Sequence, residues 1–250
     1  MKKFIYVFIM IILVGVFSYS AYKIYTIQNE YNEGEDTYDD IATDVVVEVT
    51  QGPVDTTEPK SEVPIQVDFT KLKKVNNDII GWIYNPGTVI DYPVVQGKDN
   101  EYYLKHLYTG AYNSSGTPFL DSNIKSDFSE KHSIIYAHHM KNGSMFSSIT
   151  NYKTKSYYDK HKNMYLLTPT KNYRLEVFSA YVTPADSDTY MRGFRANDKF
   201  QKYIDYIKGL SLINTGVEVT MKDTVVSLST CTYEYENARF VVHTKRVEIE

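Results

Sequence analysis

The residues best suited to chemistry in this 250-residue chain lie near its C-terminus. Cys231 is the only cysteine, and it ends the sequence Ser-Leu-Ser-Thr-Cys at residues 227–231. A single cysteine cannot form an internal disulfide, so its thiol is a buried small hydrophobic group, an intermolecular cross-link or a nucleophile. A cysteine nucleophile needs a base that can generate the thiolate, and donors directed at the oxyanion that develops on the substrate.

Arg239 follows Cys231 by eight positions and is a candidate for such a donor. The apolar residues before Cys231 predict a strand, and residues 232–237 predict a tight connection to a second strand that begins at Arg239. The two strands would pair and return the guanidinium to the thiol, where it can donate hydrogen bonds to a substrate carbonyl and favour the thiolate. The alternative is a solvated arginine in a surface ion pair with Glu234 or Glu236.

A histidine could serve as the base, and six are present. His138 and His139 directly follow a strand-like run and precede a glycine-containing loop, which is a position that suits a cleft. Successive side chains on an extended chain point to opposite faces, so at most one of the two is catalytic. A metal site at this pair would lack further cysteine or acidic ligands, so no metal is expected. The remaining four are expected to be ordinary surface or core residues: His106, His132, His161 and His243.

The N-terminus predicts a membrane anchor at residues 1–27. Lys2 and Lys3 precede an uncharged apolar run from Phe4 to Tyr22, about 19 residues or roughly 28 Å of helix, which matches the hydrocarbon core of a bilayer. This run is longer than the core of a cleavable signal peptide, so we expect it to be retained, with cleavage near residues 18–20 as the alternative. The two lysines favour a cytoplasmic N-terminus and place the rest of the chain outside the cell.

Residues 28–66 predict a flexible acidic tether. This segment has eleven acidic residues against one basic residue, Lys60, and its second half contains Pro53, Pro59 and Pro64. Like charges repel, and such a composition buries little apolar surface, which favours an extended chain. Residues 45–47 have the composition of a short strand, for which the neighbouring sequence offers no partner.

Residues 67–250 are long enough for one compact domain with a full hydrophobic core. The whole chain carries a net charge of −4. Setting aside the tether at −10 and the lysines of the anchor (Lys2, Lys3 and Lys23) leaves this domain near +3. It has no basic run with interleaved aromatic residues, so nucleic acid is not an expected partner.

The domain is expected to be mainly β with a few inserted helices. Strands are predicted at residues 79–84, 89–96, 117–121, 132–137, 164–167, 173–182, 224–229 and 239–247. Helices or helical turns are predicted at residues 68–75, 99–106, 144–152, 157–161 and 196–210. Strands and helices do not alternate regularly, which argues against a doubly wound α/β sheet. Many short, tyrosine-rich strands instead indicate a closed or partly closed β-barrel.

Taken together, these motifs resemble those of the sortases, the cysteine transpeptidases of Gram-positive bacteria, and most closely class B. Residues 228–231 with Arg239 are similar to the family signature Thr-Leu-x-Thr-Cys…Arg, with Ser227 at the position of the usual threonine. Residues 136–140 and 143–146 are similar to the class B histidine segment, although Ala137 stands where the family usually has glycine. Residues 81–96 and 99–104 also resemble class B. The similarity covers essentially all of residues 68–250.

The resemblance implies an eight-stranded sortase-type β-barrel and a two-step acyl transfer that needs no cofactor. Cys231 would attack the carbonyl of the threonine in a C-terminal sorting signal, His138 would act as general acid and base, and Arg239 would hold the carbonyl and stabilise the oxyanion. An amine of the cell-wall peptide would resolve the thioacyl-enzyme. By the same similarity, the residues that line the peptide groove are Asn100, Leu104, Ser229 and Thr230.

Three alternatives remain open from the sequence. A pilin-polymerising sortase would use the same chemistry with a lysine of another subunit as the acceptor. A hydrolytic protease would differ only in letting water resolve the intermediate. A membrane-tethered binding domain would carry the same barrel with an inert Cys231.

Overall fold

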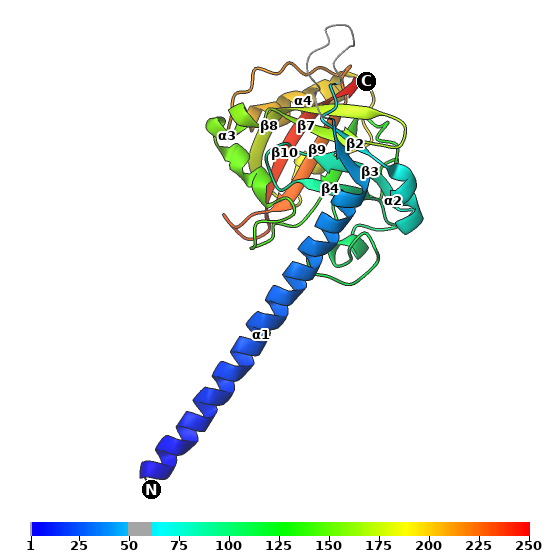
Figure 1. The fold of residues 1–250 in the computed structure, drawn as a ribbon. Coiled ribbons are helices and arrows are strands. Elements are labelled where there is room, and N and C mark those ends of the chain that lie inside the picture. Colours follow the sequence, from blue (N-terminus) through cyan, green and yellow to red (C-terminus); the bar gives the residue numbers. More distant parts are fainter. Residues whose placement is uncertain (1, 50–61) are drawn as a thin grey trace.

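In the computed structural model, which describes residues 2–49 and 62–250, a long helix leads into a closed β-barrel (Figure 1). The barrel strands are β3 (Ile79–Tyr84), β4 (Asp91–Val95), β5 (Phe119–Leu120), β6 (His132–Tyr136), β7 (Asn163–Leu167), β8 (Asn172–Pro184), β9 (Val225–Cys231) and β10 (Ala238–Ile249). Around the barrel they follow the order β10-β8-β7-β3-β4-β5-β6-β9. The pairs β4–β5 and β6–β9 are parallel and the others are antiparallel. The predicted eight-stranded barrel is therefore confirmed.

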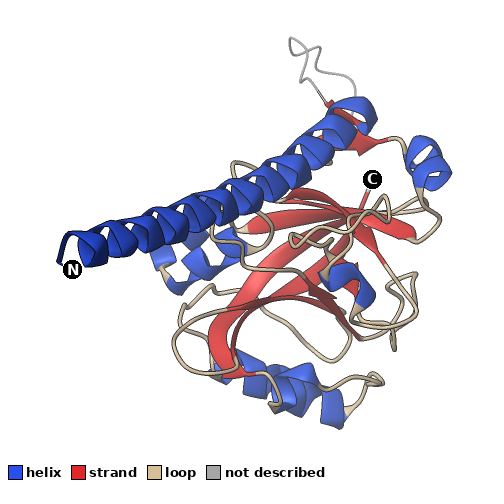
Figure 2. Cartoon of the chain, turned by 90° about the horizontal axis from the view of Figure 1, so that it is seen from below, coloured by secondary structure: helices blue, strands red, loops and turns tan. Residues whose placement is uncertain are grey.

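Helices lie around the strands rather than between them (Figure 2). The α-helices are α1 (Lys2–Val45), α2 (Phe69–Val75), α3 (Lys155–Lys160) and α4 (Asp198–Gly209). The described residues also contain three 3₁₀ helices: η1 (Tyr102–Leu104), η2 (Ser147–Lys153) and η3 (Asp188–Tyr190). Asp68 caps α2, because its carboxylate accepts from the backbone N–H groups of Thr70 and Lys71 at 2.9 and 3.1 Å. The predicted helices at residues 99–106 and 144–152 are these short 3₁₀ turns.

Two apolar clusters hold the domain together. The larger one fills the barrel and contains Trp82, which is fully buried and donates its indole N–H to Asp91. The smaller cluster lies between α4 and the barrel wall, where Phe200 and Ile204 of α4 pack with Phe178 of β8. The apolar period predicted for residues 196–210 thus marks the buried face of α4.

A buried chain of hydrogen-bonded polar side chains crosses four strands in the order β6, β9, β10 and β8. His132 Nδ1 lies 2.7 Å from the Met191 carbonyl and His132 Nε2 lies 2.8 Å from Ser227 Oγ. Ser227 Oγ lies in turn 2.6 Å from His243 Nδ1, and His243 Nε2 lies 3.0 Å from the Tyr181 hydroxyl. Each ring nitrogen has a partner, so the chain satisfies both imidazoles in their neutral forms. His132 and His243 are therefore core residues.

The expectation of an extended tether is wrong for residues 28–45, which continue α1 without a break. Their acidic residues lie mainly on exposed faces, whereas Gly34, Tyr38, Ile41 and Val45 recur at helical spacing and are buried against the domain. The net charge of the segment gives no indication of this apolar stripe. Residues 50–61 of the predicted tether lie outside the described residues, and the division at residues 27 and 66 stays a prediction.

The short strand predicted at residues 45–47 is present and pairs with a second strand. β1 (Val46–Glu48) pairs antiparallel with β2 (Ile65–Val67), with Val46 opposite Val67. This partner lies beyond the prolines of the segment, where reading along the neighbouring sequence does not reveal it. The two-stranded ribbon ties the end of α1 to the start of the barrel domain.

Tyr38 makes the central contact between α1 and the domain. Its side chain is 2 % exposed, and its hydroxyl donates to the Gly116 carbonyl at 2.5 Å and lies 2.9 Å from Thr117 Oγ. Its ring packs edge-on against Tyr92 with a centroid separation of 5.1 Å. The loop that contains Gly116 and Thr117 is thereby held against the helix.

Truncation of the Tyr38 side chain tests whether α1 is part of the folded domain. We expect Tyr38→Ala to lower the free energy of unfolding by about 3 kcal/mol, because it removes a buried ring and leaves a cavity. The thermal unfolding midpoint of the full chain in detergent measures the change. Asp36→Ala on an exposed face of the same helix is the matched control and should alter stability by less than about 0.5 kcal/mol. Equal midpoints for the Tyr38 variant and the wild type would show that α1 does not stabilise the domain.

The polar chain predicts a pH dependence of stability. Burial lowers the pKa of His132 from 6.5 to about 4, and burial also lowers the pKa of His243. Between pH 6.5 and 4 the unfolded chain binds a proton at His132 that the folded protein does not bind. The stability conferred by the neutral ring is therefore complete above pH 6.5 and is lost as the pH falls toward 4.

Chemical denaturation at several pH values measures this effect. For the wild type we expect a slope from His132 of up to about 1.4 kcal/mol per pH unit across that window. His132→Gln should be less stable at neutral pH but should show a shallower slope. An unchanged slope in this variant would exclude His132 as the source of the pH dependence.

Candidate active site

The site lies at the ends of two parallel strands. β6 and β9 pair in register from His132 opposite Val225 to Tyr136 opposite Ser229, and the Ala137 N–H continues the ladder to the Ser229 carbonyl at 3.2 Å. Because parallel strands end at the same edge of a sheet, the residues that follow β6 and end β9 meet there. This pairing brings His138 and Cys231 together, although they are far apart in the sequence.

Cys231 and Arg239 are directly opposite each other. They are paired residues in the antiparallel ladder of β9 and β10, as the predicted strand, connection and strand require. Side chains at paired positions project from the same face with their Cβ atoms about 5 Å apart. Arg239 Nη1 also donates to the Ala238 carbonyl at 3.0 Å. Of the two alternative ion-pair partners of Arg239, Glu234 and Glu236, Glu234 instead pairs with Lys153.

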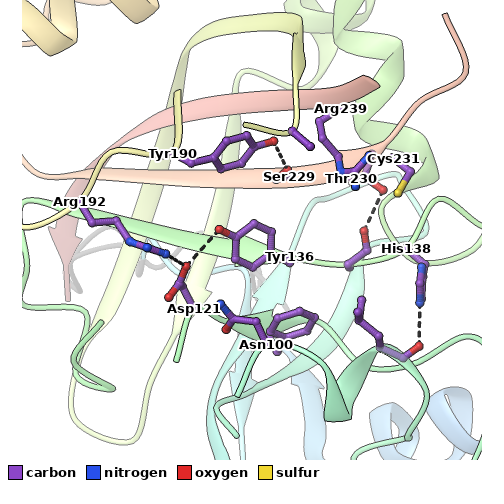
Figure 3. Close-up of a pocket in the computed structure, with 14 residues that line it drawn as sticks. Asn100, Asp121, Tyr136, His138, Tyr190, Arg192, Ser229, Thr230, Cys231 and Arg239 are labelled. Carbon is purple, nitrogen blue, oxygen red and sulfur yellow. Dashed lines mark hydrogen bonds and ion pairs between the residues drawn. The ribbon is translucent and has the colours of Figure 1, made fainter. Parts of the chain in front are cut away.

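The His138 ring is fixed by the loop that faces it. Its Nε2 lies 2.7 Å from the Leu104 carbonyl, which can only accept, so Nε2 carries the proton in the neutral ring (Figure 3). Nδ1 is then the nitrogen left to exchange a proton. The loop that contains Leu104 packs closely against Gly116, which adopts a φ of +58°. A Cβ at residue 116 would lie 2.4 Å from the Tyr103 carbonyl oxygen of this loop, so only glycine fits.

His139 lies on the other side of the chain, as alternation predicts. Its Nδ1 lies 3.1 Å from the Cys231 carbonyl and therefore donates to it. Its ring packs edge-on against Tyr233 at 5.5 Å. His139 thus contacts the backbone of Cys231 and does not line the cavity that Cys231 borders.

These side chains border a cavity of about 480 Å³, a size typical of small-molecule and peptide sites. All seven residues selected from the sequence line it: His138, Cys231, Arg239, Asn100, Leu104, Ser229 and Thr230. Cys231 is partly exposed at its rim. The fold therefore brings the seven residues to one cavity, and their roles there stay a prediction.

Part of the cavity wall was not predicted from the sequence. Asp121 is fully buried and binds the Arg192 guanidinium and the Tyr136 hydroxyl (Figure 3). Burial opposes ionisation of Asp121, but hydrogen bonds from Asn123 and the charge of Arg192 outweigh it, so the pKa of this carboxyl lies below its usual range. Asp121 directly follows the short strand β5, and Tyr136 ends β6. Their positions at strand ends were the available signal.

The predicted groove residues differ in how free their polar groups are. Thr230 Oγ donates to the Ala137 carbonyl at 2.8 Å, and Asn100 Oδ1 accepts from the Ser122 N–H at 2.7 Å. Ser229 Oγ lies 2.9 Å from the Tyr190 hydroxyl. Burial raises the pKa of Tyr190 to about 12, so this hydroxyl stays protonated and available as a donor. Tyr190 was not identified from the sequence.

The described residues include no group of three or more histidine, cysteine, aspartate or glutamate side chains placed to hold a metal ion. The cavity instead combines a thiol, an imidazole and a guanidinium. A thiol beside an imidazole and a cationic donor can carry nucleophilic attack on a carbonyl, with proton transfer by the ring and stabilisation of the oxyanion by the guanidinium.

Comparison with known proteins assigns the chain to a family. Residues 83–247 match the model of the Sortase domain. The chain is 32 % identical to Sortase B of Listeria monocytogenes over 248 residues, which cover 98 % of both chains. It is 36 % identical to Sortase B of Staphylococcus aureus over 193 residues, which cover 76 % of this chain and 79 % of that protein.

Solved structures give the same result. Sortase B from Bacillus anthracis in complex with AAEK1 superposes with a TM-score of 0.74 at 32 % identity, covering 89 % of this chain and all of the other. The Staphylococcus aureus sortase B–substrate complex superposes with a TM-score of 0.69 at 36 % identity, covering 73 % of this chain and 85 % of the other. The chain belongs to the sortase family and is a cysteine transpeptidase of the sortase B type.

Proposed function

We propose that this transpeptidase cleaves a C-terminal sorting signal after threonine and transfers the new carboxyl end to an amine of the cell-wall peptide. The observation that carries the proposal is the position of Cys231 opposite Arg239, with His138 at the adjoining strand end of the same cavity. The proposed nucleophile and oxyanion donor thus lie on the paired strands β9 and β10, and the proposed base follows β6 by two residues.

In the first step the Cys231 thiol gives its proton to Nδ1 of His138, and the resulting thiolate attacks the threonine carbonyl carbon. Negative charge develops on the carbonyl oxygen, where the Arg239 guanidinium can donate hydrogen bonds. The C–N bond then breaks, a C–S bond remains, and His138 gives a proton to the leaving amine. The fixed Nε2 contact with the Leu104 carbonyl makes Nδ1 the proton donor.

In the second step an amine attacks the thioester. His138 takes a proton from that amine, the C–S bond breaks, and the thiolate is restored as the new amide forms. Water would give hydrolysis by the same route, so the outcome depends on which nucleophile reaches the thioester. Asn100, Leu104, Ser229 and Thr230 line the groove that would hold the peptide, with Tyr190 and Tyr136 beside them.

The enzyme would act at the outer surface of the cell membrane. Among the described residues, α1 is the one helix long and apolar enough to cross a membrane, and its most apolar stretch is entirely exposed. With Lys2 and Lys3 retained in the cytoplasm, the barrel lies outside the cell. This location is where surface proteins and wall peptides meet.

Substitution of the three central residues tests the mechanism. Cys231→Ala should abolish cleavage of sorting-signal peptides while the domain stays folded. His138→Ala should lower kcat by about 10²- to 10⁴-fold, and Arg239→Ala should lower kcat by about 10²- to 10³-fold, because they remove proton transfer and oxyanion stabilisation. Release of a fluorophore from peptides that contain the signal measures each rate.

His139→Ala is the matched control for His138→Ala, because it removes the neighbouring imidazole without changing the lining of the cavity. A smaller loss than in His138→Ala is expected. Equal losses would contradict the assignment of His138, and undiminished turnover by Cys231→Ala would contradict the assignment of the nucleophile. Circular dichroism of each variant excludes unfolding as the cause.

Product analysis tests the acceptor. Peptides that begin Leu-Pro, Asn-Pro or Ser-Pro and contain the threonine are incubated with the enzyme and a glycine- or lysine-containing amine. Mass spectrometry should show a new amide at threonine for at least one signal. Hydrolysed peptide alone would favour a protease, and covalent ladders formed only with pilin subunits would favour pilus polymerisation.

A further inference from the structure

The aromatic cluster Tyr102, His106 and Tyr112 lies on the domain surface close to the point where α1 leaves the domain toward its N-terminus. Tyr102 and His106 stack with ring centroids 3.9 Å apart, and Tyr112 packs edge-on against His106 at 5.8 Å. Tyr112 is 68 % exposed and Tyr102 is 43 % exposed. The proposed catalytic mechanism uses none of these three side chains.

The position of this cluster along α1 follows from hydrogen bonds between the adjoining loop residues and the helix. Asn113, next to Tyr112, donates its side-chain amide to the Glu30 carbonyl at 2.9 Å, and the Ser114 N–H donates to the Glu30 carboxylate at 2.7 Å. Gly34 lies one turn further along, where a Cβ would approach Ser115 Oγ to 3.0 Å. The loop is therefore fixed to the helix at residue 30.

The membrane edge lies close to this point. The uncharged apolar run ends before Lys23, and the rise from Lys23 to Glu30 is about 10 Å at 1.5 Å per residue. Headgroups add about 5–8 Å on each side of the hydrocarbon core. Because α1 is a single helix from Lys2 to Val45, no break in it separates the membrane span from the loop.

The surface has the chemistry of a membrane interface. Tyrosine is enriched where a membrane meets water, because its ring is apolar and its hydroxyl is polar. Tyr22 and Tyr25 of α1, which are 62 % and 68 % exposed, lie at the predicted membrane edge. Lys105 is exposed on the same loop as Tyr112 and can meet lipid phosphates, although Glu101 is exposed nearby.

We propose that the loop of residues 101–114 rests on the phospholipid headgroups through Tyr102, His106 and Tyr112. The inference rests on the proposed membrane anchor. Leu104 of this loop and the preceding residue Asn100 both line the cavity. The Leu104 carbonyl also fixes the ring of His138. The membrane surface would therefore adjoin one wall of the catalytic cavity. In Figure 1 the loop projects from the domain beside α1, on the side of its N-terminal half.

Fluorescence quenching of the full chain in lipid vesicles tests this contact. In a Cys231→Ala background, Ala111→Cys is labelled with an environment-sensitive fluorophore, and the protein is reconstituted in phosphatidylcholine and phosphatidylglycerol vesicles that contain a lipid with a nitroxide headgroup. We expect strong quenching at residue 111. Thr170→Cys, exposed in the turn between β7 and β8, is the control site and should show none.

A second comparison isolates the aromatic contact. Tyr112→Ser, added to the labelled Ala111→Cys protein, should weaken the quenching, whereas Tyr206→Ser, at an exposed tyrosine on α4, should leave it unchanged. Circular dichroism confirms that both variants are folded. Quenching at residue 111 no stronger than at residue 170 would overturn the proposal.

Two further measurements separate this proposal from the proposed function. Flotation of the same vesicles reports whether α1 anchors the protein, and peptide cleavage by the wild type in these vesicles reports the activity. Flotation without quenching at residue 111 refutes only the headgroup contact. Failure to float refutes the anchor and the headgroup contact together, while cleavage still tests the chemistry.

Discussion

The site depends on the parallel pairing of β6 with β9. Each strand ends at the same barrel edge, and this alone places His138 within the cavity that Cys231 borders. Parallel neighbours require a long crossover, so this contact joins distant parts of the chain. The antiparallel return of β10 then adds Arg239 directly opposite Cys231. Cys231 and Arg239 are thus held in a strand ladder, and His138 is held just beyond β6 by its contact with the Leu104 carbonyl.

The core beneath the site reinforces the same strands. Ser227 of β9 bridges His132 of β6 and His243 of β10, so one hydroxyl links the three strands next to the proposed catalytic groups. Such a chain contributes to a unique arrangement only when each polar group has a partner, because an unpaired buried group is costly. Here both imidazoles are satisfied, and burial keeps them neutral.

The long N-terminal helix connects the predicted membrane anchor with the barrel domain. Tyr38 and Glu30 bind the loop that carries Leu104, and the Leu104 carbonyl binds His138. A contact network therefore runs from α1 to the proposed general base. It explains why residues 28–45 are structured in spite of their charge: the acidic groups remain hydrated on exposed faces while the apolar stripe is buried.

Local features of this protein could be predicted from its amino-acid sequence. The strand before Cys231, the short connection and Arg239 are close in the chain, so their antiparallel pairing could be predicted from hydrophobic pattern and turn length. The alternation of His138 and His139 followed from strand geometry. The apolar run after Lys3 has the length of a membrane span.

Which distant segments meet depends on the tertiary structure. Asp121 follows β5, Tyr136 ends β6, and Tyr190 and Arg192 come from a third segment, so their shared wall of the cavity depends on the barrel order. The partner of β1 lies across an intervening segment, and the buried face of α1 exists only because the domain covers it. Net charge and composition are averages over a segment, whereas burial depends on which face of a helix meets another surface.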